Sequence, residues 1–248
     1  MRRPRDPVAA WLLRRHPKLL PTFAAPSILS MIRARTTIVD QLIGMELDRV
    51  EVGQLTYWSL GSGFDARWYR LKSLLQGRLR AHHEVDEPDV IAFKDRVLSA
   101  SSFAGHWGTV HREGVGEAQW TVPPHDGALL VNLEGVSVRL GVPGTKALLK
   151  RLRRDAPTAT VILDLPGILQ PQVATGRAAA VTSARSRWMS AGATGAVSIT
   201  TRTLGHLGWQ VVDDVFSSAR PELRAPSGMP ICSGVEALRV VRLRPLDD

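Results

Sequence analysis

Apolar residues follow two different spacings along the chain, and each spacing predicts a different kind of element. Over residues 8–20 and 27–48 they recur at helical spacing, which is typical of a helix with one buried face. Shorter apolar runs, bounded by glycine, proline or acidic residues, predict strands. These runs lie at residues 57–60, 79–86, 107–112, 128–133, 158–164, 209–215 and 237–243.

Segments with helical character separate most of these strands. We expect helices at about 67–78, 87–97, 145–154, 171–190 and 200–207. Alternating strands and helices indicate an α/β fold, with a mostly parallel sheet and helices on both of its faces. The last two strands flank a proline-rich loop over 221–230, and we expect them to pair antiparallel at one end of the sheet.

Composition narrows the class of protein. The 248 residues and a hydrophobic content of 44% are enough for one large domain with a substantial core. No apolar run approaches the roughly 18 residues that span a bilayer, so we expect no membrane partner. The N-terminal apolar segment, residues 8–13, is short and lacks a cleavage site, so no signal peptide is expected. The single Cys232 cannot form an internal disulfide, which suits a cytoplasmic location.

The net charge of +9 raises the question of nucleic acid binding. Only five of the 32 basic residues are lysines, and the arginines are spread along the chain rather than gathered in one stretch. No recognition motif of a nucleic-acid-binding family is present, so nucleic acid is not the expected partner. An acidic small substrate would use the same positive charge.

Candidate binding residues stand where the predicted strands end. Gly61 and Gly63 follow the first strand, and glycines in such a turn let the backbone approach a ligand closely, although the pair fits a bare turn equally well. Asp86 ends the second strand and Glu134 follows the fourth. Carboxyl ends of parallel strands meet at one edge of a sheet, and a carboxylate there can accept from both ribose hydroxyls.

Two nucleoside-containing cofactors share this plan, namely nicotinamide dinucleotides and S-adenosylmethionine. Ala66 occupies the place of the third glycine in the dinucleotide pattern, which tolerates alanine. Asp65 stands beside the turn, where its negative charge would oppose a pyrophosphate. S-adenosylmethionine carries no phosphate and has an ammonium group, so the charge of Asp65 favours it over a dinucleotide.

Four segments together resemble the leucine carboxyl methyltransferase family, including its bacterial members that methylate small molecules. They are Ala-Arg-Thr through Asp at 34–40, Leu-Gly-Ser-Gly-Phe-Asp-Ala-Arg from 60, Glu-Val-Asp-Glu-Pro from 84, and the fourth strand with Glu-Gly-Val to 136. The resemblance covers roughly residues 30–165. It implies a class I (Rossmann-like) methyltransferase fold with a seven-stranded, mostly parallel sheet and an antiparallel last strand.

The resemblance also implies the cofactor, S-adenosyl-L-methionine, and roles for individual residues. Arg35 would hold the carboxylate of its methionine part, a contact that suits the guanidinium fork. Asp86 would bind the ribose hydroxyls, and Glu134 would accept from the ammonium group. The remaining expected cofactor-binding residues are Gly61, Gly63 and Asp65.

Two positions depart from the family pattern. His111 and Arg112 align with an Asp-Leu pair that many relatives place against the adenine after the third strand. Arg139 stands where relatives often carry a tyrosine facing the substrate, and it suggests a substrate anion, although an outward-facing arginine fits as well. No residue is assigned as catalytic. His111 is the candidate for a general base, which a phenol with a pKa near about 10 would need and an ionised carboxylate would not.

These residues favour methyl ester formation on a carboxylate of a small-molecule or peptidic natural product. Methylation of a phenolic or enolic hydroxyl of a polyketide-like compound and an inactive cofactor-binding scaffold stay open as alternatives. We expect residues 1–50 to form a helical cap that contributes to the cofactor site. Residues 51–248 would form the methyltransferase core, with a short lid around 166–198. No metal site is expected, and homodimer formation stays open.

Overall fold

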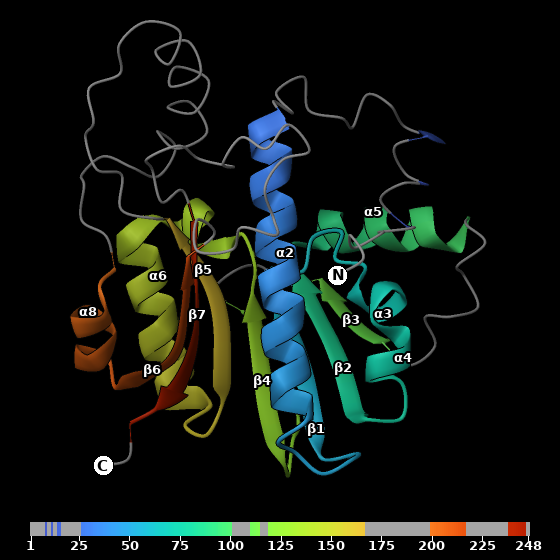
Figure 1. Ribbon diagram of the computed structural model, residues 1–248. Coiled ribbons are helices and arrows are strands. Elements are labelled where there is room, and N and C mark those ends of the chain that lie inside the picture. The colour runs from blue at the N-terminus through green and yellow to red at the C-terminus, as the bar shows by residue number, and fades with distance from the viewer. Residues whose placement is uncertain are drawn as a thin grey trace, which may run out of the picture.

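The computed structural model describes residues 26–100, 110–114, 119–166, 199–216 and 238–246, together with Val8, Trp11, Arg14 and Arg15. Its strands form one seven-stranded sheet in the order β3-β2-β1-β4-β5-β7-β6 (Figure 1). All neighbouring strands from β3 to β5 pair parallel, and β7 pairs antiparallel with both β5 and β6. The strands are β1 (Leu55–Leu60), β2 (Leu79–Asp86), β3 (Val110–Gly114), β4 (Ala128–Leu133), β5 (Thr160–Pro166), β6 (Trp209–Phe216) and β7 (Leu238–Pro245).

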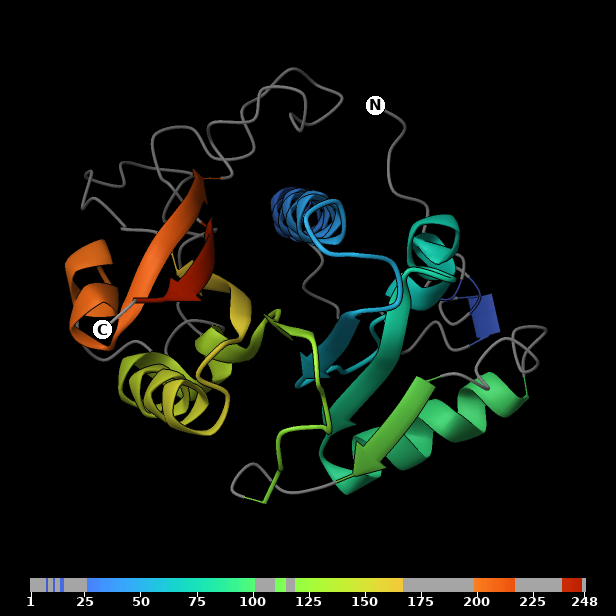
Figure 2. The same cartoon turned by 90° about the horizontal axis from the view of Figure 1, so that it is seen from below.

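Helices cover both faces of the sheet, as Figure 2 shows along the strand direction. The long α2 lies across one face, while α6 packs on the other and α8 lies against β6. The helices are α2 (Pro26–Leu47), α3 (Arg67–Arg70), α4 (Lys72–Leu75), α5 (Pro88–Ser99), α6 (Val136–Asp155) and α8 (Thr201–His206). This architecture confirms the fold class expected from the sequence.

Two hydrophobic cores lie on the two faces of the sheet, and β1 contributes to both. All six residues of β1 are buried, because a central strand is covered on both sides. Tyr57 packs with α2 residues such as Ile38, whereas the next residue, Trp58, packs with α6 residues such as Leu149. Successive side chains of a strand point to opposite faces, so this alternation is what a central strand requires.

Several element boundaries differ from the expectation. Helix α6 begins at Val136 rather than 145, because its first turn is joined to the rest through a kink at Gly141 (φ 62°) followed by Pro143. Those residues interrupt helical periodicity, so the pattern alone missed the first turn. Strand β3 continues to Gly114 rather than ending at 112, and the expected helix over 67–78 is divided into α3 and α4 at Leu71.

Some expectations fall on residues outside the described part of the chain. The predicted helix over 171–190 lies there completely, as does nearly all of the lid around 166–198. The predicted helix over 8–20 is described only at four separate residues. Within the described ranges, no helix is both long and apolar enough to cross a membrane.

Candidate functional site

The glycine turn after β1 is fixed to the end of β2. The backbone N–H groups of Gly61 and Ser62 both donate to the carbonyl oxygen of Val85, at 2.8 and 3.0 Å. Gly61 has φ 73°, and a Cβ there would lie 2.6 Å from Cγ2 of Val136. Gly63 has φ 47°, but a Cβ there would meet nothing within 4 Å. Gly61 is therefore needed for packing, while the backbone at Gly63 borders open space.

Asp86 lies beside this turn, as the sequence led us to expect. Its carboxylate accepts from the backbone N–H of Gly63 at 2.6 Å and from that of Glu87 at 2.8 Å. These bonds fix the carboxylate at the sheet edge. Each carboxylate oxygen has two lone pairs, so both can still accept from a hydroxyl group. Of the residues expected from the sequence, Gly61, Gly63 and Asp86 thus come together.

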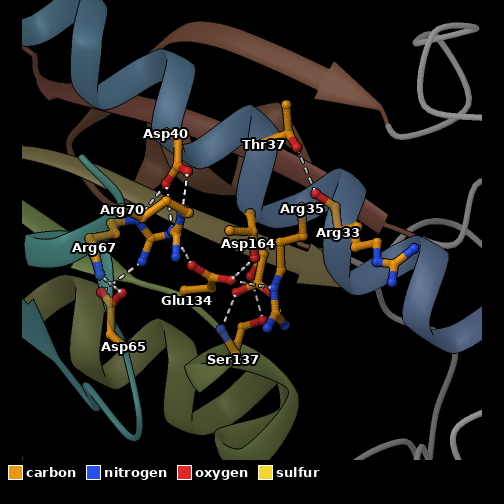
Figure 3. A network of polar contacts seen from close by, with 12 residues as sticks. Arg33, Arg35, Thr37, Asp40, Asp65, Arg67, Arg70, Glu134, Ser137 and Asp164 are labelled. Atoms are coloured by element: carbon orange, nitrogen blue, oxygen red, sulfur yellow. Dashed lines mark hydrogen bonds and ion pairs between the residues drawn. The ribbon is translucent and has the colours of Figure 1, made fainter. Parts of the chain in front are cut away.

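Arg35 and Glu134 also meet, two strands further along the same edge (Figure 3). Nε of Arg35 donates to Oε1 of Glu134 at 2.9 Å, and Thr36 Oγ1 donates to the same oxygen. Nη1 of Arg35 donates to Oδ2 of Asp164 at 3.1 Å. Burial by itself would lower the pKa of Arg35, but the charges of Asp164 and Glu134 outweigh it and raise that pKa.

Asp164 is a site residue that the sequence reasoning missed. It lies near the carboxyl end of β5, is fully buried, and accepts the backbone N–H of Gly135 at 2.7 Å in addition to the Arg35 bond. Burial raises its pKa despite the opposing charge of Arg35. The carboxylate thereby holds both Arg35 and the turn that follows β4. The signal was present, because the fifth apolar run ends on this aspartate as the second ends on Asp86.

Arg67 links the glycine turn to Glu134 and α2. Its guanidinium is almost fully buried and donates to Asp40 at 2.8 Å, to Asp65 at 2.7 Å and also to Glu134. Arg70 donates to both oxygens of Asp40. Figure 3 shows these side chains converging from α2, α3 and the strand ends. The network therefore connects the expected N-terminal cap to the sheet edge.

Burial and Arg67 act in opposite directions on the two acids of this network. Burial would raise the pKa of Asp65 and of Glu134, but Arg67 outweighs it, so both pKa values are lowered. One oxygen of Asp65 accepts from the backbone N–H of Arg67 and the other from its side chain. Contact of Asp65 with a cofactor stays a prediction. Because Arg67 compensates its charge, Asp65 is weaker evidence against a pyrophosphate than the sequence suggested.

A cavity of about 230 Å³ opens beside Asp86, between the strand ends and α6. Arg139 is exposed and lines this cavity, so the structure brings it to Asp86. His111 does not line it. This histidine is exposed on edge strand β3, where its ring stacks on His83 at 5.0 Å. The cavity is lined by Leu60, Gly61, Val85, Asp86, Glu87, Trp120, Val136, Arg139, Leu140, Gly144, Ala147, Leu148 and Arg151.

Neither half of the His111-Arg112 pair is positioned to replace the Asp-Leu pair of the family. Both residues lie within β3 rather than after it. Arg112 donates to Asp95 at 2.8 Å and lies 3.4 Å from Glu84, beneath the strand ends. Among the residues that the structure describes, no three histidine, cysteine, aspartate or glutamate side chains are grouped to hold a metal ion.

Comparison with known proteins tests the family resemblance and the fold. The model of the leucine carboxyl methyltransferase family matches residues 5–115. No curated protein sequence gives a significant match. N,N-8-amino-8-demethyl-D-riboflavin dimethyltransferase from Streptomyces davawensis has a similar structure, with a TM-score of 0.52 and 15% identity, covering 83% of this chain and 52% of the other.

Mitomycin 7-O-methyltransferase is similar too, with a TM-score of 0.51 and 14% identity over 87% of this chain and 56% of the other. A structure described as a pericyclic reaction enzyme has a TM-score of 0.50 and 12% identity, covering 78% of this chain and 43% of the other. The chain therefore spans about half the length of these structures. The family match confirms the resemblance expected from the sequence over residues 5–115, and the similar structures confirm the expected fold class.

Proposed function

We propose, from the match of residues 5–115 to the leucine carboxyl methyltransferase family and from the methyltransferase fold, that this chain is an S-adenosylmethionine-dependent O-methyltransferase. One observation carries the proposal. Asp86, the Gly61–Gly63 turn and the Arg35–Glu134 pair stand in a row along the carboxyl ends of β2, β1 and β4. Asp86 offers an acceptor for the ribose hydroxyls, the turn offers open backbone beside the ligand, and the charged pair suits the carboxylate and ammonium of the methionine part. S-adenosylmethionine presents its groups in this same order.

The spacing of these groups suits the length of the cofactor. Neighbouring strands lie about 4.8 Å apart, so the two to three spacings from Asp86 to Arg35 cover roughly 10–14 Å. In S-adenosylmethionine about seven bonds join a ribose hydroxyl carbon to the carboxylate carbon, roughly 8 Å when extended. A hydrogen bond of about 2.8 Å at each end brings the span between protein groups to roughly 14 Å.

Two further features fit this ligand. Ser62 Oγ is buried in the glycine turn without a hydrogen-bond partner among the described residues, next to the open space over Gly63. A ligand in that space would offer it one. The network at the methionine end has four carboxylates and three guanidinium groups, so when fully ionised it suits the single net positive charge of S-adenosylmethionine. Its members are Arg35, Asp40, Asp65, Arg67, Arg70, Glu134 and Asp164.

The residues of this chain would act mainly by alignment. When bound, S-adenosylmethionine would supply a methyl group to the acceptor oxygen by in-line displacement, in which the O–C bond forms as the C–S bond breaks and S-adenosylhomocysteine is released. Arg35 would hold the carboxylate and Asp86 the ribose, fixing both ends of the ligand. Glu134, already engaged with Arg35 and Arg67, would accept from the ammonium group. Rotation about the ligand's long axis would thereby be restricted, which orients the methyl group for the acceptor.

For the acceptor we favour a carboxylate of a small-molecule or peptidic compound. A carboxylate is ionised at neutral pH and needs no general base. Arg139 is exposed near the start of α6, five residues beyond Glu134, and it matches such an anion in charge. A phenolic or enolic acceptor is the alternative, and it would require a base. The candidate base, His111, is exposed on the edge strand β3, where its ring stacks on His83. A cofactor-binding scaffold without methyl transfer is the third reading.

Calorimetry with S-adenosylhomocysteine tests the cofactor assignment. We expect the wild-type chain to bind, and Asp86→Ala to weaken binding about 10- to 100-fold, the loss expected for hydrogen bonds to a charged group. Asp89→Ala is the matched control, because Asp89 is an exposed acid in the first turn of α5 and does not line the cavity. Absence of binding by the wild-type chain at high micromolar ligand would refute the proposal.

Mass spectrometry separates the three readings of the activity. The chain is incubated with S-adenosylmethionine and mixtures of carboxylic acids or phenols, and a mass gain of one methyl group is sought. A product cleaved by mild base is an ester, whereas a base-stable product is an ether. Cofactor binding without any methylated product across both mixtures would favour the scaffold.

A further inference from the structure

The cavity beside Asp86 continues past the ribose-binding position toward Trp120. Its near side is formed by strand ends, including Val85 and Gly61, and its far side by α6 residues and Trp120. Since the methionine end of the ligand points toward Arg35 at β4, its base must extend in the other direction, away from Glu134. A base attached to a ribose held by Asp86 would lie in this cavity, because Asp86 is part of its lining, and the residues that face it there would decide how it is recognised.

Trp120 is held rigidly in the segment between β3 and β4. Its side chain is buried, and its ring meets Trp58 edge to face at 5.2 Å, with the ring planes inclined at 67°. The guanidinium carbon of Arg151 lies 3.7 Å from the centre of the indole ring. Arg151 thus lies over Trp120, which in turn meets Trp58 edge to face, and these three residues are here named the stacked wall.

Arg151 is held over the indole by hydrogen bonds as well as by its contact with the ring. One Nη group donates to the carbonyl oxygen of Trp120 at 2.7 Å, and Nε donates to Asp155 one helical turn along α6 at 3.3 Å. These contacts hold the guanidinium as a planar, positively charged surface at the cavity. Nucleic acid bases stack on aromatic rings and on guanidinium planes alike, and such stacking is tolerant of base identity.

We propose that the stacked wall, with Arg151 as its outermost plane, recognises the adenine base of the cofactor in this chain. The proposal rests on the proposed function, because it assigns the base end of the same ligand. It also accounts for a departure in the sequence. The residues aligned with the Asp-Leu pair of relatives, His111 and Arg112, lie within β3 and do not line the cavity, whereas Trp120 and Arg151 do.

The test compares two ligands that differ only in the base. S-adenosylhomocysteine carries adenine, and S-ribosylhomocysteine lacks it; both are titrated by calorimetry into the wild-type chain and its variants. We expect Arg151→Ala to weaken S-adenosylhomocysteine about tenfold, which corresponds to the loss of one stacking surface, and to leave S-ribosylhomocysteine unchanged. Arg154→Ala is the control, because Arg154 lies on the same helix, is exposed and pairs with Asp155.

Arg151→Lys distinguishes a plane from a charge, because lysine keeps the charge but offers no planar surface. The proposal expects this variant to bind as weakly as the alanine variant. Full affinity of Arg151→Lys would overturn it, as would equal weakening of both ligands by Arg151→Ala. If the wild-type chain binds S-adenosylhomocysteine and all variants match it, only the stacked wall is refuted. If the wild-type chain does not bind at all, the proposed function itself falls.

Discussion

Removing Arg67 is the change with the most definite expected effect on stability. This guanidinium is 2% exposed and pairs with three partly or fully buried carboxylates, Asp40, Asp65 and Glu134. Replacing it with alanine would leave those charges without their shared partner. Removal of one partner from a buried ion pair costs about 3–5 kcal/mol. In a chain of this size each kcal/mol corresponds to roughly 2–4 °C, so the melting temperature should fall by roughly 6–20 °C.

The loss should also depend on pH. In the folded protein the pKa values of Asp65 and Glu134 are lowered, since Arg67 outweighs burial. Their contribution to stability is therefore present above the unfolded pKa near about 4 and is lost as the pH falls below it. Without Arg67, burial raises the pKa values of both acids. As the solution becomes acidic, protonation neutralises the two carboxylates and removes the cost of burying them without a partner. The difference in unfolding free energy should be largest near pH 7 and shrink toward pH 4.

Urea unfolding of wild type and Arg67→Ala at pH 7 and pH 4.5 measures both effects. Arg154→Ala is the control, because its side chain is 73% exposed, and it should leave the unfolding free energy unchanged. Arg67→Lys keeps one charge but cannot reach three carboxylates at once, so its loss should be intermediate. A loss below about 1 kcal/mol for Arg67→Ala, or an equal loss at both pH values, would refute the reasoning.

Two other changes test particular packing features. Gly61→Ala should destabilise the protein by about 1–3 kcal/mol more than Gly53→Ala. Both glycines have φ between 73° and 79°, but only at Gly61 would the added Cβ meet Val136. Equal losses of unfolding free energy in urea would contradict this. Burial lowers the pKa of His82 to about 3 in the folded chain, whereas a histidine in the unfolded chain titrates near 6.5. Below about pH 6.5 the unfolded chain therefore binds a proton that the folded chain does not, and the stability of the folded state falls. His82→Phe should reduce the decrease in unfolding free energy between pH 7 and pH 5 by about 2 kcal/mol, as measured by urea unfolding at the two pH values. An unchanged decrease would mean that another group is responsible for it.

The strands and the residues at their carboxyl ends were predictable because the relevant signals are local. A buried central strand such as β4 has an almost continuous run of apolar residues, which can be recognised in the sequence. The residue that follows such a run is then the one at the carboxyl end of the strand. The parallel arrangement then brings Gly61, Asp86 and Glu134 to one edge. The segment over α6 was predicted less well, since Gly141 and Pro143 break the periodicity on which the prediction depended.

The partners of the charged residues were not predictable from spacing. Asp40 lies five positions from Arg35, and the sequence offered no partner for it; in the structure it binds Arg67 and Arg70 from α3. Asp164 meets Arg35 across 129 residues of chain. Such pairings depend on which helix face lies over which strand end, a property of the packed molecule rather than of any segment.

The sequence by itself thus determined the type of sheet, the edge that carries the candidate binding residues and the family that residues 5–115 match. Tertiary structure decided which residues close the site, including Asp164, Trp120 and Arg151. It also separated His111 from the cavity by placing it on the edge strand. The physical reason is that periodicity reports on neighbours along the chain, whereas a buried charge or ring is satisfied by whatever the folded layers bring beside it.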